Sequence, residues 1–378
     1  MPIKIIIASD SFKGSLTSEE AGKAAGRGIK TALPDAQVEI VPVADGGEGT
    51  VDALCCCLNG EKVRVKVSDP HGDVITAEYA ISGDTAVIEI ASASGLTLIP
   101  PERRNPRLTT SFGTGELIRD ALTRGCRNFL IGLGGSATND AGVGMLSALG
   151  YRFLDSEGNP IGFGGEEVGR IKSIDDSQVM PELMEASFTV ACDVTNPLTG
   201  PNGASRIFGP QKGADSESVK ELDEALVSFA QISAKTLGSD FSTHPGAGAA
   251  GGLGFAFLSF LNGNLRPGIE MVLDAVGFDS RIEGASLIIT GEGKLDRQTC
   301  MGKAPYGVLQ RAKTKGIPVI ALGGSIEPDA IETLMHAGFR AAFPIVPGPV
   351  SIEEAMRPEV ASANIERTLS QLIRIFNI

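Results

Sequence analysis

The 378-residue chain has no tryptophan, only three histidines and 5% aromatic residues. The scarcity of histidine disfavours a His-rich metal site and a Ser-His-Asp hydrolase. The six cysteines form no C-x-x-C pair, and three of them, Cys55, Cys56 and Cys57, are consecutive in an apolar stretch. We therefore expect buried free thiols in a reducing compartment rather than a disulfide or metal framework.

The sequence also lacks long apolar runs and an excess of basic residues. No uninterrupted apolar stretch reaches about 18 residues, the length of a membrane span, and the opening MPIKIII is too short for a secretory signal. The 33 basic and 46 acidic residues give a net charge of −13, which provides no general attraction to polyanions. We expect a soluble, cytoplasmic protein that acts on small molecules, without nucleic acid or membrane as a partner.

What is present is an alternation of strand and helix signals. Five apolar strand patterns, each followed by a loop with glycine or acidic residues, occur in IKIIIASD, VEIVPVADGGEGT, RNFLIGLGGSATND, ASLIITGEGKLD and IPVIALGGS. Thr17 and Glu20 have the spacing of a capping box, which predicts a helix from Ser18 to about Lys30. The pattern predicts an α/β protein with a doubly wound, mostly parallel, Rossmann-like sheet and a site at its carboxyl edge.

Two regions interrupt this rhythm. Residues 62–90 read as an antiparallel meander, and residues 151–211 mix short strands with Gly/Pro loops before a strongly helical segment. The length also favours two domains. We expect a discontinuous Rossmann-like domain made of residues 1–61, 105–150 and 281–378, and an inserted α/β domain made of residues 62–104 and 151–280. The active site is expected in the cleft between them.

The stretch HPGAGAAGG contains Gly246, Gly248 and Gly251 in a G-x-G-x-x-G pattern, the fingerprint of dinucleotide binding. That fingerprint requires a strand directly before its first glycine, whereas the preceding DFSTHP is polar and contains proline. A helix start or close helix packing explains the small residues better. This motif is therefore the only support for the alternative function, a nicotinamide-dependent dehydrogenase of a small hydroxy acid.

Other loops fit phosphoryl transfer. GLGGSATND follows a clean strand and precedes a helical run, so it can present backbone N–H groups and hydroxyls to an oxyanion, although no Walker sequence is present. Phosphoryl transfer needs carboxylates for a divalent cation or a base and ammonium groups for the phosphates. The loop tips carry both kinds of group: Asp10, Asp45, Glu48, Asp140, Asp193, Glu292 and Asp296, with Lys13, Lys212, Lys294 and Lys303.

A resemblance now becomes specific. DSFKGSL, VADGGEGTVDAL, VIEIASASGL, RNPRLTTSFGTGELIRDAL, IGLGGSATNDAG, ACDVTNPLTGPNGAS, FGPQKGA, PGAGAAGGLG and TGEGKLDRQTCMGKAPYGV, in this order, resemble the signature motifs of the type I glycerate kinase family. The resemblance extends from the first strand to about Ser325. It implies ATP-dependent, Mg²⁺-assisted phosphorylation of D-glycerate, with 2-phosphoglycerate the favoured product, and a Rossmann-like domain with an inserted α/β domain.

The resemblance also suggests residue roles. Asp193 is the candidate general base or metal ligand, with Asp140 as a second metal ligand and with Lys13 and Asp45 as further catalytic residues. Gly134, Gly135, Ser136, Asp296 and Lys303 are candidates for binding ATP. Candidates for binding glycerate are Ser11, Ser15, Glu48, Arg103 and Asn139. A non-catalytic sugar-acid-binding protein is the remaining alternative, although such a protein needs neither metal nor base.

Overall fold

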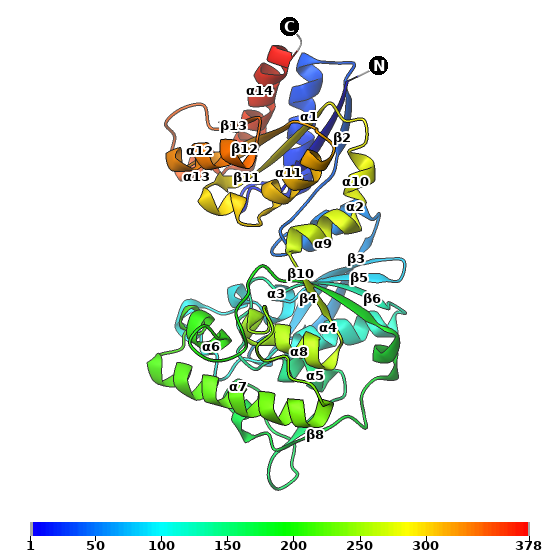
Figure 1. The fold of residues 1–378 in the computed structure, drawn as a ribbon, viewed down its shortest axis with the longest axis vertical. Coiled ribbons are helices and arrows are strands. Elements are labelled where there is room, and N and C mark those ends of the chain that lie inside the picture. Colours follow the sequence, from blue (N-terminus) through cyan, green and yellow to red (C-terminus); the bar gives the residue numbers. More distant parts are fainter. Residues whose placement is uncertain (1–2, 377–378) are drawn as a thin grey trace. The chain divides into compact units, whose positions relative to one another are not determined.

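A computed structural model of the chain describes residues 3–376. Met1 and Pro2 of the opening run, and residues 377–378 of the predicted Rossmann-like domain, lie outside the described residues. The chain divides into two compact units (Figure 1). The five-stranded unit comprises residues 1–45, 52–59 and 269–378, and the six-stranded unit comprises residues 46–51 and 60–268. No helix within residues 3–376 is long and apolar enough to cross a membrane.

The five-stranded unit contains one parallel sheet with the order β13-β12-β11-β1-β2. Counted along the chain within the unit, this order is 2-1-3-4-5, a doubly wound arrangement whose switch point lies between β1 and β11. The strands are β1 (Lys4–Ser9), β2 (Gln37–Ile40), β11 (Leu287–Leu295), β12 (Val319–Ile326) and β13 (Ala341–Pro344). The helices are α1 (Ser18–Ala32), most of α2 (Thr50–Cys57), α9 (Gly268–Ala275), α10 (Phe278–Arg281), α11 (Ala304–Thr314), α12 (Pro328–Ala337), α13 (Ile352–Ala355) and α14 (Pro358–Phe376).

Helices cover both faces of this sheet. Ile5, Ile6 and Ile7 in β1 are all nearly inaccessible, as expected for a strand covered on both sides. Alternate residues of the strands, Ile5 and Ile7 among them, share a core with α1 and α14, which pack side by side in Figure 1. Helix α11 packs against β1, β11 and β12. The predicted capping box is confirmed, because Thr17 and Glu20 exchange hydrogen bonds at the start of α1.

The six-stranded unit has a mixed sheet with the order β10-β9-β6-β5-β4-β3, in which β5, β6, β9 and β10 run parallel. The predicted meander is confirmed, since β3, β4 and β5 pair antiparallel. The strands are β3 (Glu61–Ser68), β4 (Val74–Ser82), β5 (Thr85–Glu89), β6 (Asn128–Gly132), β9 (Ser187–Ala191) and β10 (Asn264–Arg266), with the separate pair β7 (Arg152–Leu154) and β8 (Ser173–Asp175). The helices are α3 (Ala91–Ser94), α4 (Phe112–Thr123), α5 (Val143–Ala148), α6 (Ala204–Phe208), α7 (Ser216–Leu237) and α8 (Leu253–Phe260).

Several of the expected domain assignments are wrong. Residues 46–51 and 60–61, expected in the Rossmann-like domain, belong to the six-stranded unit. Residues 105–150 belong to the six-stranded unit, because β6 pairs with β5 and β9 rather than with a strand of the Rossmann-like sheet. Residues 269–280, which were expected in the inserted domain, belong instead to the five-stranded unit. An apolar run identifies β6 as a buried parallel strand but carries no information about which sheet it joins.

The G-x-G-x-x-G stretch is a packing element. It lies between α7 and α8. The element before it is therefore a helix and not a strand, since β9 ends at Ala191 and β10 begins only at Asn264. Gly251 has φ +71°, and a Cβ there would lie 1.9 Å from the carbonyl oxygen of Thr138. The glycines therefore permit close backbone contact with the loop after β6, and the context required for a nicotinamide fingerprint is missing.

The cysteines are all free thiols, as expected. Their predicted burial is only partly right, because Cys126 is buried while Cys56 is exposed.

Candidate active site

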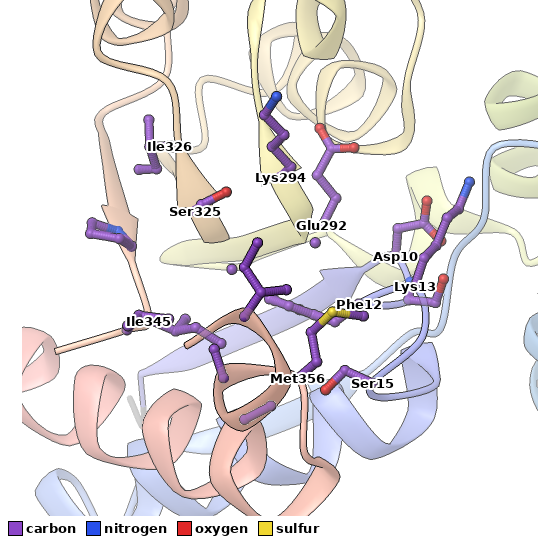
Figure 2. A pocket seen from close by; sticks show the side chains of 18 of the residues that line it. Asp10, Phe12, Lys13, Ser15, Glu292, Lys294, Ser325, Ile326, Ile345 and Met356 are labelled. Carbon is purple, nitrogen blue, oxygen red and sulfur yellow. The ribbon is translucent and has the colours of Figure 1, made fainter. Parts of the chain in front are cut away.

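A pocket of about 710 Å³ lies at the carboxyl edge of the five-stranded sheet (Figure 2). Its walls come from the carboxyl ends of β11 and β12 and from the segments after β1, β2, β11 and β13, together with α13 and the start of α14. The switch point between β1 and β11 is where α1 and α11 depart to opposite faces, which leaves a crevice that connecting helices do not fill. The fold therefore places this pocket where doubly wound proteins bind ligands.

The pocket has a charged end and an apolar end. Figure 2 shows Asp10, Lys13 and Glu292 on one side, and Ile326 and Ile345 on the other. The apolar wall is made by side chains from the end of β12, from the loop after β13 and from α13 with the residue after it. These side chains are Ile326, Ile345, Val346, Val350, Ile352 and Met356. This division suits a ligand that is flat and apolar at one end and ionic at the other.

Asp10 follows β1 at the charged end and is only 2% exposed. Its Oδ1 accepts a 2.6 Å hydrogen bond from the backbone N–H of Ser11. Burial, followed by repulsion from Asp45, raises the pKa of Asp10 from 3.8 to about 7, although the Ser11 N–H and the Lys13 ammonium partly oppose the rise. The carboxyl group of Asp10 can therefore take up and release a proton near neutral pH, as a proton-transfer group requires.

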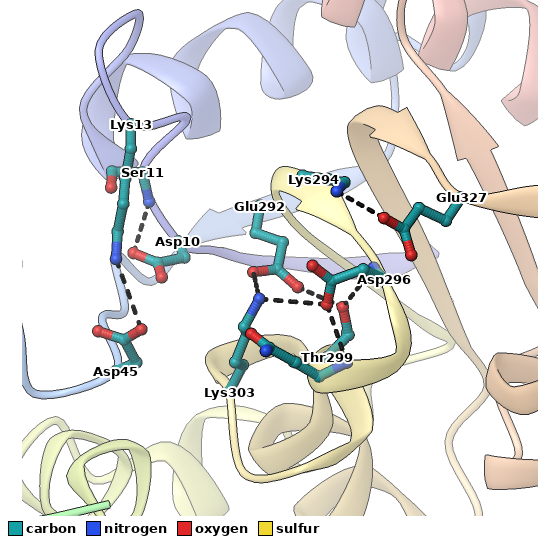
Figure 3. Close-up of polar contacts among 11 residues, drawn as sticks. Asp10, Ser11, Lys13, Asp45, Glu292, Lys294, Asp296, Thr299, Lys303 and Glu327 are labelled. Atoms are coloured by element: carbon teal, nitrogen blue, oxygen red, sulfur yellow. Dashed lines mark hydrogen bonds and ion pairs between the residues drawn. The ribbon is translucent and has the colours of Figure 1, made fainter. Parts of the chain in front are cut away.

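Two lysines balance the carboxylates (Figure 3). Lys13 Nζ lies 3.6 Å from Asp45 Oδ2, so two predicted catalytic residues form an ion pair. Lys303 Nζ lies 3.6 Å from Glu292 Oε2 and 3.4 Å from Asp296 Oδ1. Each amine is therefore already placed among carboxylates, in a position from which it can neutralise a bound anion.

Thr299 organises the loop after β11. Its hydroxyl donates to Glu292 Oε1 at 2.6 Å and accepts from the Asp296 backbone N–H at 3.0 Å. Asp296 caps the following 3₁₀ turn by accepting from the Gln298 N–H. Burial raises the pKa of Glu292, while the Thr299 hydrogen bond and Lys303 oppose that rise.

A second set of predicted residues gathers at one edge of the six-stranded unit. β6 and β9 are paired parallel strands, so Gly134, Gly135 and Ser136 after β6 and Asp193 after β9 emerge at the same edge. A Cβ on Gly134 would lie 3.0 Å from the Cα of Gly47, which brings the loop of Glu48 to this edge as well. Asp193 is exposed, and its Oδ1 accepts a 2.9 Å hydrogen bond from the Gly268 N–H.

Comparison with known proteins now bears on these two groups of residues. The model of the Glycerate kinase family matches residues 5–377. The chain belongs to this family. It is 49% identical to the glycerate kinase of Bacillus subtilis (strain 168), over 97% of this chain and 96% of that protein. It is 47% identical to the glycerate 2-kinase of Escherichia coli (strain K12), over 97% and 98%.

A solved structure supports the same assignment. The crystal structure of a protein described as glycerate kinase 2 from Salmonella typhimurium LT2 matches with a TM-score of 0.92 and 44% identity. The match covers 100% of this chain and 99% of that one. The resemblance drawn from the motifs is therefore confirmed, and so are the fold class and the assignment to a phosphotransferase family.

Within this glycerate kinase family member, Asp140 is a structural carboxylate. It is 1% exposed and accepts hydrogen bonds from the N–H and hydroxyl of Ser111 and from the N–H groups of Gly142 and Gly144. These bonds tie the starts of α4 and α5 together. Burial raises the pKa of Asp140, and the bonds from Ser111 oppose that rise. A metal could bind this carboxylate only if some of these bonds were lost.

Two of the predicted substrate ligands differ sharply in exposure. Asn139 is fully buried; its Nδ2 donates to Ser205 Oγ at 2.9 Å, and its Oδ1 has no partner among the described residues. Arg103 is exposed in a short 3₁₀ turn. By contrast, Ser11 and Ser15 both line the pocket with Lys13.

The pocket also contains acids to which the sequence interpretation gave no role. Asp10 and Glu292 were counted among the loop-tip carboxylates, yet they are the most buried acids of this pocket. The available signal was positional, because each directly follows the buried segment of a strand at the switch point. Strand order was needed to use that signal.

Proposed function

We propose that this chain transfers the γ-phosphoryl group of ATP to a hydroxyl of D-glycerate and that 2-phosphoglycerate is the product. Membership of the Glycerate kinase family supports the reaction class. The regiochemistry rests on the resemblance and on the name of the Escherichia coli relative, a glycerate 2-kinase.

The observation that carries the proposal is the pocket at the switch point. Its volume of about 710 Å³ lies within the range of small-molecule sites. The apolar end suits a purine base, and Lys13 and Lys303 at the charged end suit phosphates. Asp296 and Lys303 would therefore contribute to nucleotide binding. Gly134, Gly135 and Ser136 would cradle an anionic group through backbone N–H groups and a hydroxyl.

In the proposed reaction, the glycerate hydroxyl oxygen forms a bond to the γ-phosphorus while the bond from that phosphorus to the β–γ bridging oxygen breaks. The hydroxyl proton passes to a carboxylate base, for which Asp193 is the candidate, and ADP leaves. Lys13 would neutralise charge on the moving phosphoryl group, and Asp45 would hold the Lys13 ammonium in place.

Glycerate binding would use groups that complement a carboxylate and two hydroxyls. Arg103 can form a bidentate pair with the carboxylate. Ser11, Ser15 and Glu48 can hydrogen-bond to hydroxyls, and Ser15 Oγ lacks a hydrogen-bond partner within residues 3–376. Asn139 would act from behind the loop, because its side chain is buried.

The donor chemistry fits Mg²⁺, which binds one or two carboxylates together with phosphate oxygens and water. Among residues 3–376, no cluster of three or more His, Cys, Asp or Glu side chains has the arrangement of a metal site. If Asp193 is a metal ligand rather than the base, its exposed carboxylate would hold the ion, and Asp140 would do so only by releasing its present hydrogen bonds. When bound, Mg²⁺ supplies charge neutralisation on the phosphates.

The deciding experiment measures ADP release by the purified chain with ATP. We expect release only when both D-glycerate and Mg²⁺ are present. Phosphorus NMR of the product should then show 2-phosphoglycerate. ADP release without D-glycerate would contradict the proposed acceptor, and 3-phosphoglycerate would correct the regiochemistry.

A further inference from the structure

Lys212 is a buried lysine that the reaction described above does not use. It ends the 3₁₀ turn Pro210–Lys212 in the six-stranded unit and is only 2% exposed. Its Nζ donates to Ser136 Oγ at 2.7 Å and to the carbonyl oxygen of Thr138 at 2.7 Å. Lysine is almost never fully buried unless paired, because desolvating an ammonium group costs several kcal/mol.

The electrostatics around Lys212 reflect that cost. Burial lowers the pKa of Lys212 to about 7, and the buried carboxylate of Asp140 opposes the shift. A neutral side chain would avoid this penalty. The presence of an amine here therefore needs a reason beyond filling space.

Holding the glycine loop in position does not supply that reason. The loop is already anchored by two backbone hydrogen bonds, from the Leu96 N–H to Gly135 O at 2.8 Å and from the Ala137 N–H to Ser94 O at 2.9 Å. These bonds lie on both sides of Ser136. What Lys212 adds is a charge and a fixed direction for one hydrogen bond.

That direction decides where the Ser136 proton goes. When Lys212 is protonated, its ammonium group has donors and no acceptor, so Ser136 Oγ accepts from Lys212 and the Ser136 proton is left for another acceptor. The described part of the chain offers that proton no acceptor. Gly134 and Gly135, next to Ser136, are exposed. Ser136 itself is 6% exposed, so its hydroxyl is a donor at the inner edge of a loop whose two glycines are exposed.

We propose that Lys212 is a positioning residue that makes Ser136 a dedicated hydrogen-bond donor to an oxyanion of a substrate bound at the 134–136 loop. The inference rests on the proposed function and deepens it. The oxyanion is either a phosphate of ATP or the carboxylate of D-glycerate. A positive charge behind the serine also strengthens its donor character.

The test compares the Ser136→Ala, Lys212→Met and double variants with the unmodified chain, with KM and kcat measured for each substrate. A hydrogen bond to a charged group predicts that each single variant raises KM for one substrate by about 10- to 100-fold, with a much smaller change in kcat. Because Lys212 acts through Ser136, the double variant should be no worse than the worse single variant. A rise confined to ATP identifies a phosphate, and a rise confined to D-glycerate identifies the carboxylate.

Ser233→Ala is the matched control, since Ser233 is a buried serine of α7 in the same unit, and its hydroxyl, unlike that of Ser136, has no partner within the described chain. It should leave both KM values unchanged. Multiplying effects in the double variant, or unchanged KM values in both folded single variants, would overturn the proposal.

If the Lys212→Met variant does not fold, the test uses the Ser136 variants alone. Ser136→Ala must raise KM and Ser136→Thr, which keeps the hydroxyl, must restore it; any other result overturns the inference. If the unmodified chain releases no ADP, the proposed function fails separately. The loop is then tested by calorimetric titration with ATP and with D-glycerate, where Ser136→Ala must weaken binding of one of them.

Discussion

Asp10 shows how one residue can serve a site at the expense of the fold. Its carboxyl keeps its proton up to about pH 7 in the native chain but ionises near 3.8 in the unfolded chain. The native state therefore binds more protons between these values, so the stability that Asp10 contributes is full below pH 3.8 and is lost as the pH rises through 7.

Replacing Asp10 by Asn removes this penalty, since the amide cannot ionise. The stability advantage of D10N over the unmodified chain should grow by on the order of 2 kcal/mol or more from pH 5 to pH 8, because each pKa unit corresponds to about 1.4 kcal/mol. Urea denaturation in EDTA at both pH values measures the gain. Activity should fall in the same variant. A stability difference independent of pH would show that Asp10 ionises normally.

Asp193 was predicted to act either as general base or as metal ligand, and Asp193→Asn separates the two roles. If it is the base, kcat should fall by about 100- to 10,000-fold while the Mg²⁺ concentration for half-maximal activity stays constant. If it is a metal ligand, that concentration should rise instead. Steady-state rates across a Mg²⁺ titration decide between them. Full activity at unchanged Mg²⁺ demand would remove Asp193 from the site.

At the scale of elements, two glycines on the buried face of α1 differ in how closely neighbouring atoms approach them. A Cβ on Gly28 would lie 2.4 Å from the carbonyl oxygen of Glu366 in α14, so the two helices touch through backbone there. A Cβ on Gly26 would meet its nearest atoms at 3.7 Å, an ordinary contact. The sequence shows both as buried-face glycines of one helix and cannot tell them apart.

This difference predicts opposite outcomes for two similar variants. Gly28→Ala should destabilise the chain by about 1–3 kcal/mol, because α14 must move to relieve the overlap. Gly26→Ala, its matched control, should be neutral or stabilising by up to about 1 kcal/mol, because alanine is the better helix former. Thermal unfolding of the two variants in parallel measures this. Equal effects would mean that α14 yields easily at Glu366.

The elements themselves were largely readable from the sequence. The capping box at Thr17, the meander of β3 to β5 and the strands β1, β11 and β12 follow from local patterns. β13 was missed, because its four residues, Ala341–Pro344, are short and only partly buried. β6 was recognised as a strand but assigned to the wrong sheet, since strand pairing is a long-range property that periodicity does not encode.

At the scale of the whole molecule, the lack of long-range pairing information in local patterns explains which site residues could be found. Lys13 and Asp45 come from different loops yet form an ion pair in one pocket, as expected for loops at one carboxyl edge. Asp140 and Asn139 carried the same loop-tip signal but are buried by packing that only the fold reveals. The expectation that the active site lies in a cleft between two domains stays a prediction.

The nucleotide-binding residues predicted from the sequence fall in both compact units. Amide hydrogen exchange, which reports on every segment of the chain, can therefore test which of them bind ATP. The large pocket lies within the five-stranded unit. We therefore expect Mg²⁺-ATP alone to slow amide hydrogen exchange in the segments 10–16, 292–303 and 344–356, because a ligand that binds the native state suppresses local opening at its site.

The 134–138 loop gives the contrasting readout in the same experiment. Its exchange should slow with Mg²⁺-ATP if Ser136 holds a phosphate, and only on addition of D-glycerate if Ser136 holds the carboxylate. Peptides from β3 and β4 are internal controls, since they contribute no residue to the pocket. Nucleotide protection confined to the 134–138 loop would move the ATP site out of the large pocket and leave its apolar wall without a role.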